Sequence, residues 1–328
     1  MDFARHYHPP ELSLWQGRPD TPAGACFFQC VQPLDMGASR TEQTPDAFAL
    51  LGFVCDEGVR RNAGRTGAAA GPNALRAQLG RLPVHRKDVV VYDAGNVVCE
   101  YDDLENAQQA LAEGVFRLLS ASLTPILIGG GHEMAFGHYQ GIVRYLAQRP
   151  LTIVNFDAHF DMRPLLPLQK GSSGTPFLQI AMAAAEAGAH FDYRCLGIQP
   201  QGNIAPLFQT AQDHRVQVLS ADDMQTDSNR SQVFVRQILQ DASCLYLSLC
   251  LDVFAAAFAP GVSAPQSRGL LPWQVIPLTR QLAASGKVLT YDVAELLPEA
   301  DPDARTAKLA ASMVHDIVHF HQRGPTPR

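Results

Sequence analysis

Short, strongly apolar segments alternate with amphipathic segments along most of the chain. The apolar segments predict eight strands, at residues 48–55, 89–92, 125–129, 151–156, 193–198, 216–219, 244–251 and 287–292. Most of them are continuously apolar rather than alternating, which is typical of strands buried on both faces. Between and after them, apolar residues recur at the spacing of an amphipathic helix, at residues 104–121, 133–147, 229–241, 272–285 and 303–322. The pattern predicts an α/β fold in which helices cover both faces of a mainly parallel sheet.

No internal repeat, low-complexity tract or charged linker divides the sequence. A length of 328 residues suits one large α/β domain or two ordinary ones. Because no boundary is visible, we expect a single domain over residues 1–328, in which residues 1–45 form a loop-rich N-terminal extension.

Composition narrows the classes of partner. The chain is 46% hydrophobic and 18% charged, which excludes disorder and coiled coil. The net charge of −6 and the scattered basic residues exclude a basic surface of the kind that binds nucleic acid or an anionic membrane. No apolar run reaches the ~18 to 20 residues that cross a bilayer, and seven cysteines are an odd number, as expected of reduced thiols. We therefore expect a cytoplasmic protein, a homo-oligomer, that acts on a small molecule.

Three predicted strands are followed by unusual polar residues. Ligand sites of open parallel sheets lie beyond the carboxyl ends of the strands, so these positions are candidates for chemistry. The first strand end reads GGGHE (129–133), the second DAHFD (157–161), and the third carries Asp252.

Asp157, His159 and Asp161 alternate on an extended segment, so their side chains project from one face and can converge. Two such carboxylates without a nearby lysine repel each other unless a cation lies between them. His132 adds a ligand from another strand end, where three glycines let the backbone approach closely. The alternative is that the two aspartates cap loops and that His159 is a hydrogen-bonded core histidine.

The donor set indicates which ions would bind. Imidazoles mixed with carboxylates favour Mn²⁺, Fe²⁺ or Zn²⁺ over Ca²⁺ or Mg²⁺. More than four ligands indicate two ions, which can share one water, lower its pKa and present hydroxide to an electrophilic carbon. The sequence therefore predicts a metal-dependent hydrolase.

Over roughly residues 48–310, these motifs resemble the ureohydrolase family, which contains arginase, agmatinase and formimidoylglutamase. His132 matches the family's glycine-rich turn, NFDAHFD (155–161) matches its D-A-H-x-D segment, and SLCLDVFAAAFAPG (248–261) matches its D-x-D segment followed by A-P-G. Other details look closest to the formimidoylglutamase branch: GGGHE, the continuation DMR, SSGTPF (172–177) and APGVSAP (259–265).

The resemblance implies a three-layer α/β/α sandwich around an eight-stranded, mainly parallel sheet, with two Mn²⁺ per chain. It implies metal ligands at His132, Asp157, His159, Asp161, Cys250 and Asp252. The implied reaction is hydrolysis of N-formimidoyl-L-glutamate to L-glutamate and formamide, a step of histidine degradation, by attack of a metal-bridging hydroxide. Asp161 is suited to hold that hydroxide and shuttle its proton, and Glu295 aligns with a glutamate facing the amidine end. An agmatinase or other guanidino hydrolase, and a catalytically impaired metal-binding homologue, are the alternatives.

Cys250 departs from the family pattern, which has an aspartate bridging the metals at this position. A metal lowers the pKa of a thiol enough to make it a ligand. Cys250 is therefore predicted to bind as a thiolate, on the same strand face as Asp252. The alternative is a buried core thiol beside a weakened second ion site.

The candidate substrates differ at the end opposite the amidine or guanidine group, because formimidoylglutamate carries two carboxylates there and agmatine carries none. Guanidinium groups on predicted rim loops can hold such carboxylates, and the hydroxyls of SSGTPF can hydrogen-bond to them. The candidate substrate-binding residues are Arg163, Ser173, Thr175, Arg65 and Arg268. Each arginine is otherwise a solvated surface residue, and each hydroxyl a turn residue.

Overall fold

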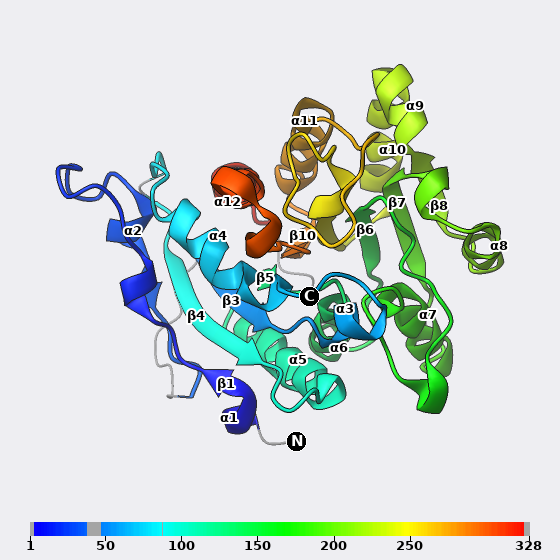
Figure 1. Cartoon of the computed structure of the whole chain (residues 1–328), viewed down its shortest axis with the longest axis horizontal. Coiled ribbons are helices and arrows are strands. Elements are labelled where there is room, and N and C mark those ends of the chain that lie inside the picture. Colours follow the sequence, from blue (N-terminus) through cyan, green and yellow to red (C-terminus); the bar gives the residue numbers. More distant parts are fainter. Residues whose placement is uncertain (1–2, 38–46, 87, 325–328) are drawn as a thin grey trace.

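The computed structural model describes residues 3–37, 47–86 and 88–324, and places one large sheet at its centre (Figure 1). The sheet has the strand order β1-β4-β3-β5-β10-β9-β6-β7-β8, and β2 also pairs with β4. Its strands are β1 (Tyr7–His8), β2 (Gln32–Pro33), β3 (Phe48–Val54), β4 (Val91–Val98), β5 (Thr124–Gly129), β6 (Thr152–Phe156), β7 (Asp192–Ile198), β8 (Gln217–Ser220), β9 (Leu245–Cys250) and β10 (Val288–Ala294). The eight strands from β3 to β10 pair in parallel, which confirms the predicted core of the fold.

Helices cover both faces of the sheet, as the apolar runs predict (Figure 1). The described helices are α1 (Phe3–His6), α2 (Phe27–Cys30), α3 (Glu57–Arg61), α4 (Gly71–Leu79), α5 (Leu104–Ser120), α6 (Met134–Leu146), α7 (Pro176–Glu186), α8 (Ala205–Asp213), α9 (Ala221–Thr226), α10 (Ser228–Asp241), α11 (Pro272–Ala283) and α12 (Arg305–Phe320). Apolar side chains of α4, α10, α11 and α12 pack on one face, and those of α5, α6, α7 and α8 pack on the other. None of the helices in the described part of the chain combines the length and apolarity needed to cross a bilayer.

The prediction for the edge of the sheet needs correction. Residues 89–92 were expected to form a strand, whereas β4 runs from Val91 to Val98 and includes Asp93 and Asn96. These polar residues interrupt the apolar pattern by which a buried strand is recognised. Asp93 can lie inside the core because it forms a buried ion pair with Arg76. The predicted extension 1–45 is also not simply loop, because β1 and β2 pair with β4; its residues 38–45 lie outside the described part.

The five predicted helices are present with small shifts at their ends, but the other seven described helices, of which α4, α7 and α8 are the longest, were not predicted. In α7 the sequence PFLQIAMAAAE is apolar on most sides, so it lacks a clear amphipathic stripe. Proline in the first turn marks the starts of α4, α7 and α8 and was the available signal.

The order of the central strands positions the site. β5, β10, β9 and β6 are neighbours in the sheet, although they are far apart in the sequence. Their last residues are in register: Val293 pairs with Ile128, Ala294 with Cys250, and Phe156 with Leu249. Parallel strands end at the same edge, so the loops that follow these four strands meet there.

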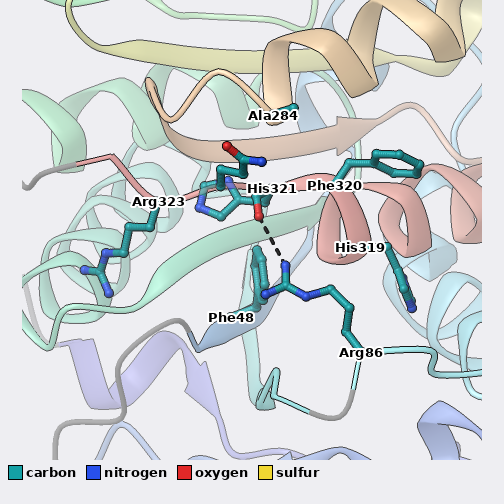
Figure 2. Close-up of a pocket in the computed structure, with 8 residues that line it drawn as sticks. Phe48, Arg86, Ala284, His319, Phe320, His321 and Arg323 are labelled. Carbon is teal, nitrogen blue, oxygen red and sulfur yellow. Dashed lines mark hydrogen bonds between the residues drawn. The ribbon is translucent and has the colours of Figure 1, made fainter.

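A cavity of about 440 Å³ lies beside Phe48, the first residue of β3 (Figure 2). Arg86 reaches into this region and donates from Nη1 to the main-chain oxygen of His321, at 3.2 Å. Nη2 of Arg86 donates to Asp88, at 2.7 Å. The guanidinium therefore fastens the segment after α12 to the body of the molecule.

We expect the buried ion pair of β4 to contribute strongly to stability. Arg76 Nη2 lies 2.9 Å from Asp93 Oδ1, and both side chains are 1% exposed. Arg76→Met should lower the free energy of unfolding by about 3–5 kcal/mol in a urea titration, because it leaves a buried charge unpaired. The exposed pair Arg18–Asp20, at 2.8 Å, is the matched control, and Arg18→Met should leave the free energy of unfolding nearly unchanged, because water screens an exposed pair. If the two variants lowered the free energy of unfolding equally, burial would not explain the contribution of the Arg76–Asp93 pair.

Candidate metal centre

The residues predicted to bind metal lie at the ends of three central strands, and the predicted catalytic residue Glu295 follows the fourth. His132 lies in the turn between β5 and α6, and Asp157 directly follows β6. Cys250 is the last residue of β9, and Asp252 lies in the 3-10 turn Leu251–Val253 that follows it. Glu295 directly follows β10. The topology of the sheet therefore brings together side chains separated by more than 160 positions in the sequence.

Their ligand atoms form two groups that share one residue. His132, Asp157 and Cys250 form the first group, and Asp157, His159 and Asp252 form the second. Within each group the candidate atoms lie within 4.8 Å of one another. Asp161 lies beside the first group, with Oδ2 3.1 Å from Nδ1 of His132. The shared Asp157 gives the geometry of a centre for two ions.

Nδ1 of His132 shows that a cation fits this place. This atom is buried and has no hydrogen-bond partner within the described residues, although it lies 3.0 Å from Oδ2 of Asp157. In the second group, Nδ1 of His159 lies 3.0 Å from Oδ2 of Asp252. A buried nitrogen that faces carboxylates without bonding to them is accounted for by an ion between the three groups.

The electrostatics of the unliganded residues point the same way. Burial would lower the pKa of His132, but the neighbouring carboxylates of Asp157 and Asp161 raise it well above its usual value. Burial raises the pKa of Asp161 to about 6, and the negative charge of Asp157 adds to the effect. Burial and the carboxylates also raise the pKa of the Cys250 thiol. The centre therefore holds an excess of negative charge that protons or metal ions must balance.

Glu295 is fixed against the glycine-rich turn. One carboxylate oxygen accepts a hydrogen bond from the main-chain N–H of His132, at 2.9 Å. Burial, followed by the charge of Asp252, raises the pKa of Glu295 to about 8. Glu295 and Asp161 both have positive φ angles, of 71° and 49°, a backbone conformation that residues other than glycine rarely adopt.

A cavity of about 320 Å³ opens onto this centre. Its floor carries His159, Asp161, Cys250, Asp252 and Glu295. Its walls include Asn62, Arg163, Ser173 and Asn203, so two of the predicted substrate-binding residues lie where a substrate would extend.

The other three predicted substrate-binding residues do not line the cavity. Arg65 donates to the main-chain oxygens of Val262 and Ser263, at 2.5 and 3.2 Å. Arg268 pairs with Asp222 on the surface. The buried hydroxyl of Thr175 bonds within the turn that starts α7.

Asn62 was not identified from the sequence. It follows α3, and its Nδ2 donates to Oγ of Ser173 across the cavity wall, at 3.3 Å. A single asparagine in a polar loop gives no signal by itself, and the proximity of these two residues depends on contacts 111 positions apart.

Comparisons with known proteins agree with this geometry. The profile of the arginase family matches residues 46–319. A formimidoylglutamase from Legionella pneumophila (strain Paris) is 42% identical over 97% of this chain and 99% of its own length. A formimidoylglutamase from Ralstonia nicotianae is 44% identical over 93% of this chain and 94% of its own length.

Solved structures give the same result for the fold. The crystal structure of Trypanosoma cruzi formiminoglutamase with a pair of Mn²⁺ ions matches with a TM-score of 0.75 and 26% identity, over 86% of this chain and 95% of that one. The crystal structure of formimidoylglutamase from Bacillus subtilis has a TM-score of 0.77 at 18% identity, over 92% and 95% of the two chains. The latter likeness shows the fold alone.

Cys250 can be tested as a ligand by counting ions. A thiolate keeps one negative charge in the first group, so the dialysed wild type and Cys250→Asp should both approach two Mn²⁺ per chain. Because the thiol must lose a proton on binding, Mn²⁺ affinity of the wild type should also rise more steeply with pH than that of the variant.

Metal analysis after dialysis, and titrations between pH 6.5 and 8.5, measure both quantities. Cys244→Ala, which changes a buried thiol outside both groups, is the control and should bind as the wild type does. A wild type that holds one ion or none beside a variant that holds two would show that Cys250 is a neutral core thiol.

Proposed function

The chain belongs to the arginase family, and we propose that it is a metal-dependent formimidoylglutamase, which hydrolyses N-formimidoyl-L-glutamate to L-glutamate and formamide. Relatives that bear this name and match nearly the whole chain support the assignment. The reaction would be a step of histidine degradation. The observation that carries the proposal is the pair of ligand groups that share Asp157 beneath a cavity with an arginine in its wall.

Two Mn²⁺ ions suit this centre. Imidazole, carboxylate and thiolate donors match the preferences of a first-row transition metal, and a solved relative contains Mn²⁺. His132, Asp157 and Cys250, with Asp161 beside them, would hold one ion, and Asp157, His159 and Asp252 would hold the other. Bound there, the ions supply Lewis acidity and lower the pKa of a water molecule to near neutrality.

Two carboxylates complete the reaction. Asp161 lines the cavity and is poised to take a proton from the attacking water and to pass it to the departing amine. Glu295 faces the same cavity, where it can hold the cationic amidine end. Its raised pKa returns toward the usual value when that cation binds, because a nearby positive charge favours the ionised carboxylate.

The wall of the cavity favours a substrate with carboxylates. Arg163 is exposed, and its guanidinium has no hydrogen bond to another side chain in the part of the chain that the structure describes. Ser173 and Asn62 lie in the same wall and offer neutral donors. Agmatine presents an amine at this end, so a guanidinium would repel it, whereas formimidoylglutamate presents two carboxylates.

Arg163→Ala should mainly raise KM for N-formimidoyl-L-glutamate, by roughly tenfold or more, because it removes a contact made equally in the ground and transition states. The assay contains added Mn²⁺ and measures formamide, urea and ammonia separately with formimidoylglutamate, agmatine and arginine. Arg268→Ala, at an exposed arginine paired with Asp222, is the matched control and should leave KM unchanged.

Each remaining outcome distinguishes an alternative. Urea from agmatine or arginine as the main product would establish a guanidino hydrolase. A protein that binds Mn²⁺ but hydrolyses none of the three substrates would be an impaired homologue.

A further inference from the structure

A row of buried polar side chains crosses the sheet directly behind the metal centre. Asp292 of β10 pairs in register with Ser248 of β9, and Ser248 pairs with Asn155 of β6. Each of these residues is 0% exposed. Since alternate residues of a strand share a face, Ser248 points to the same side as Cys250, two residues nearer the strand end.

Such a row is unusual in the middle of a parallel sheet. The flanking positions on these strands are apolar, and Leu247, Leu249 and Val293 belong to the core on the opposite face. A buried polar group without a partner destabilises a protein, whereas an apolar residue of similar size does not. The row therefore calls for a role beyond filling space.

Asp292 collects hydrogen bonds from three directions. Its Oδ1 accepts from Oγ of Ser248, at 2.6 Å, and its Oδ2 accepts from Nδ1 of His138 on α6, at 2.8 Å. The hydroxyl of Tyr246 also donates to Oδ2. An ionised carboxylate only accepts, so all three partners act as donors to it.

This arrangement determines which nitrogen of His132 carries the proton. A serine hydroxyl has one hydrogen, and Ser248 donates it to Asp292. Oγ of Ser248 can then only accept from Nε2 of His132, which lies 2.9 Å away. An imidazole that binds a metal ion is neutral and has a single N–H, so in that state Nδ1 has the free lone pair. Nδ1 is the unpartnered atom that faces Asp157 and Asp161.

We propose that Asp292, acting through Ser248, fixes the tautomer and orientation of His132 so that Nδ1 is presented to the metal ion, and that His138 and Tyr246 hold Asp292 in place for this purpose. The inference rests on the two-ion centre proposed above. Asp292, Ser248, His138 and Tyr246 are positioning residues, since they act on the ion only through His132.

The same row reaches the shared ligand from the other side. Nδ2 of Asn155 donates to Oδ2 of Asp157, at 3.1 Å, and to the hydroxyl of Tyr193, at 2.9 Å. Both members of the first ligand group that come from β5 and β6 are therefore oriented from behind. His159 and Asp252 of the second group bond to each other and not to this row.

That asymmetry makes the proposal testable by counting ions. Ser248→Ala should weaken Mn²⁺ binding at one of the two sites by about 10–100-fold, the usual effect of losing a partner behind a metal ligand, and leave the other site unchanged. Calorimetric titration of Mn²⁺ into the full-length apo protein measures both sites. Ser248→Thr keeps the hydroxyl and should restore affinity to within a few-fold, and Asp292→Asn should reproduce the one-site loss.

Stability is followed separately through the melting temperature of the apo protein. Ser231→Ala removes a buried hydroxyl of α10 outside the cluster, and should change neither site. If Ser248→Ala binds both ions as the wild type does, or loses affinity equally at both sites, the hydrogen bonds from Asp292 through Ser248 have only a structural role and the proposal is wrong. If the wild type itself binds no Mn²⁺, the two-ion centre fails instead, and the proposed function with it.

Discussion

The repulsion among buried carboxylates is the constraint around which this molecule is organised. Asp157, Asp161 and Asp252 meet at the ends of two neighbouring strands, in a place that excludes most water. At the effective dielectric of a protein site, like charges 4 Å apart repel by about 4 kcal/mol, which is a sizeable part of the stability of a domain. Burial, and then the charge of Asp157, raises the pKa of Asp161, and the carboxylates raise the pKa values of His132 and His159, as expected where negative charge is in excess. Metal ions relieve it without neutralising the groups that perform the chemistry.

The sheet makes that concentration of charge possible. Four adjacent parallel strands stop at one edge, so the ligands follow strands rather than long loops. Below the edge, the row of Asp292, Ser248 and Asn155 connects the ligands to the interior, and α6 contributes His138 to it. Rigid strands limit movement of the ligands, which a site of this geometry requires. Stability and metal binding therefore depend on the same strands.

The sequence predicted the strands, and the meeting of the candidate ligands at one edge of the sheet, because both signals are local. Continuous apolar runs identify buried strands, and Asp157, His159 and Asp161 are spaced two apart after one of them. Roles that depend on long-range contacts were not predictable. Asp93 lies within a strand because Arg76 is beside it, and Arg65 is turned to main-chain oxygens of a distant loop. The link from Asp292 to His132 likewise joins three elements whose proximity no spacing reveals.

The neighbours of Cys250 leave room for the thiolate ligand proposed here, at a position where the ureohydrolase sequence pattern has an aspartate. Its register partner on β10 is Ala294, whose methyl group leaves room on the shared sheet face for a sulfur atom. Metal–sulfur bonds of about 2.3 Å are slightly longer than bonds to oxygen, which offsets the shorter reach of the cysteine side chain. The charge of the centre is unchanged when the thiol ionises. Because burial and then the surrounding carboxylates oppose that ionisation, a bound ion would have to supply the stabilisation, so the proposed ligand and its metal would depend on each other at this position.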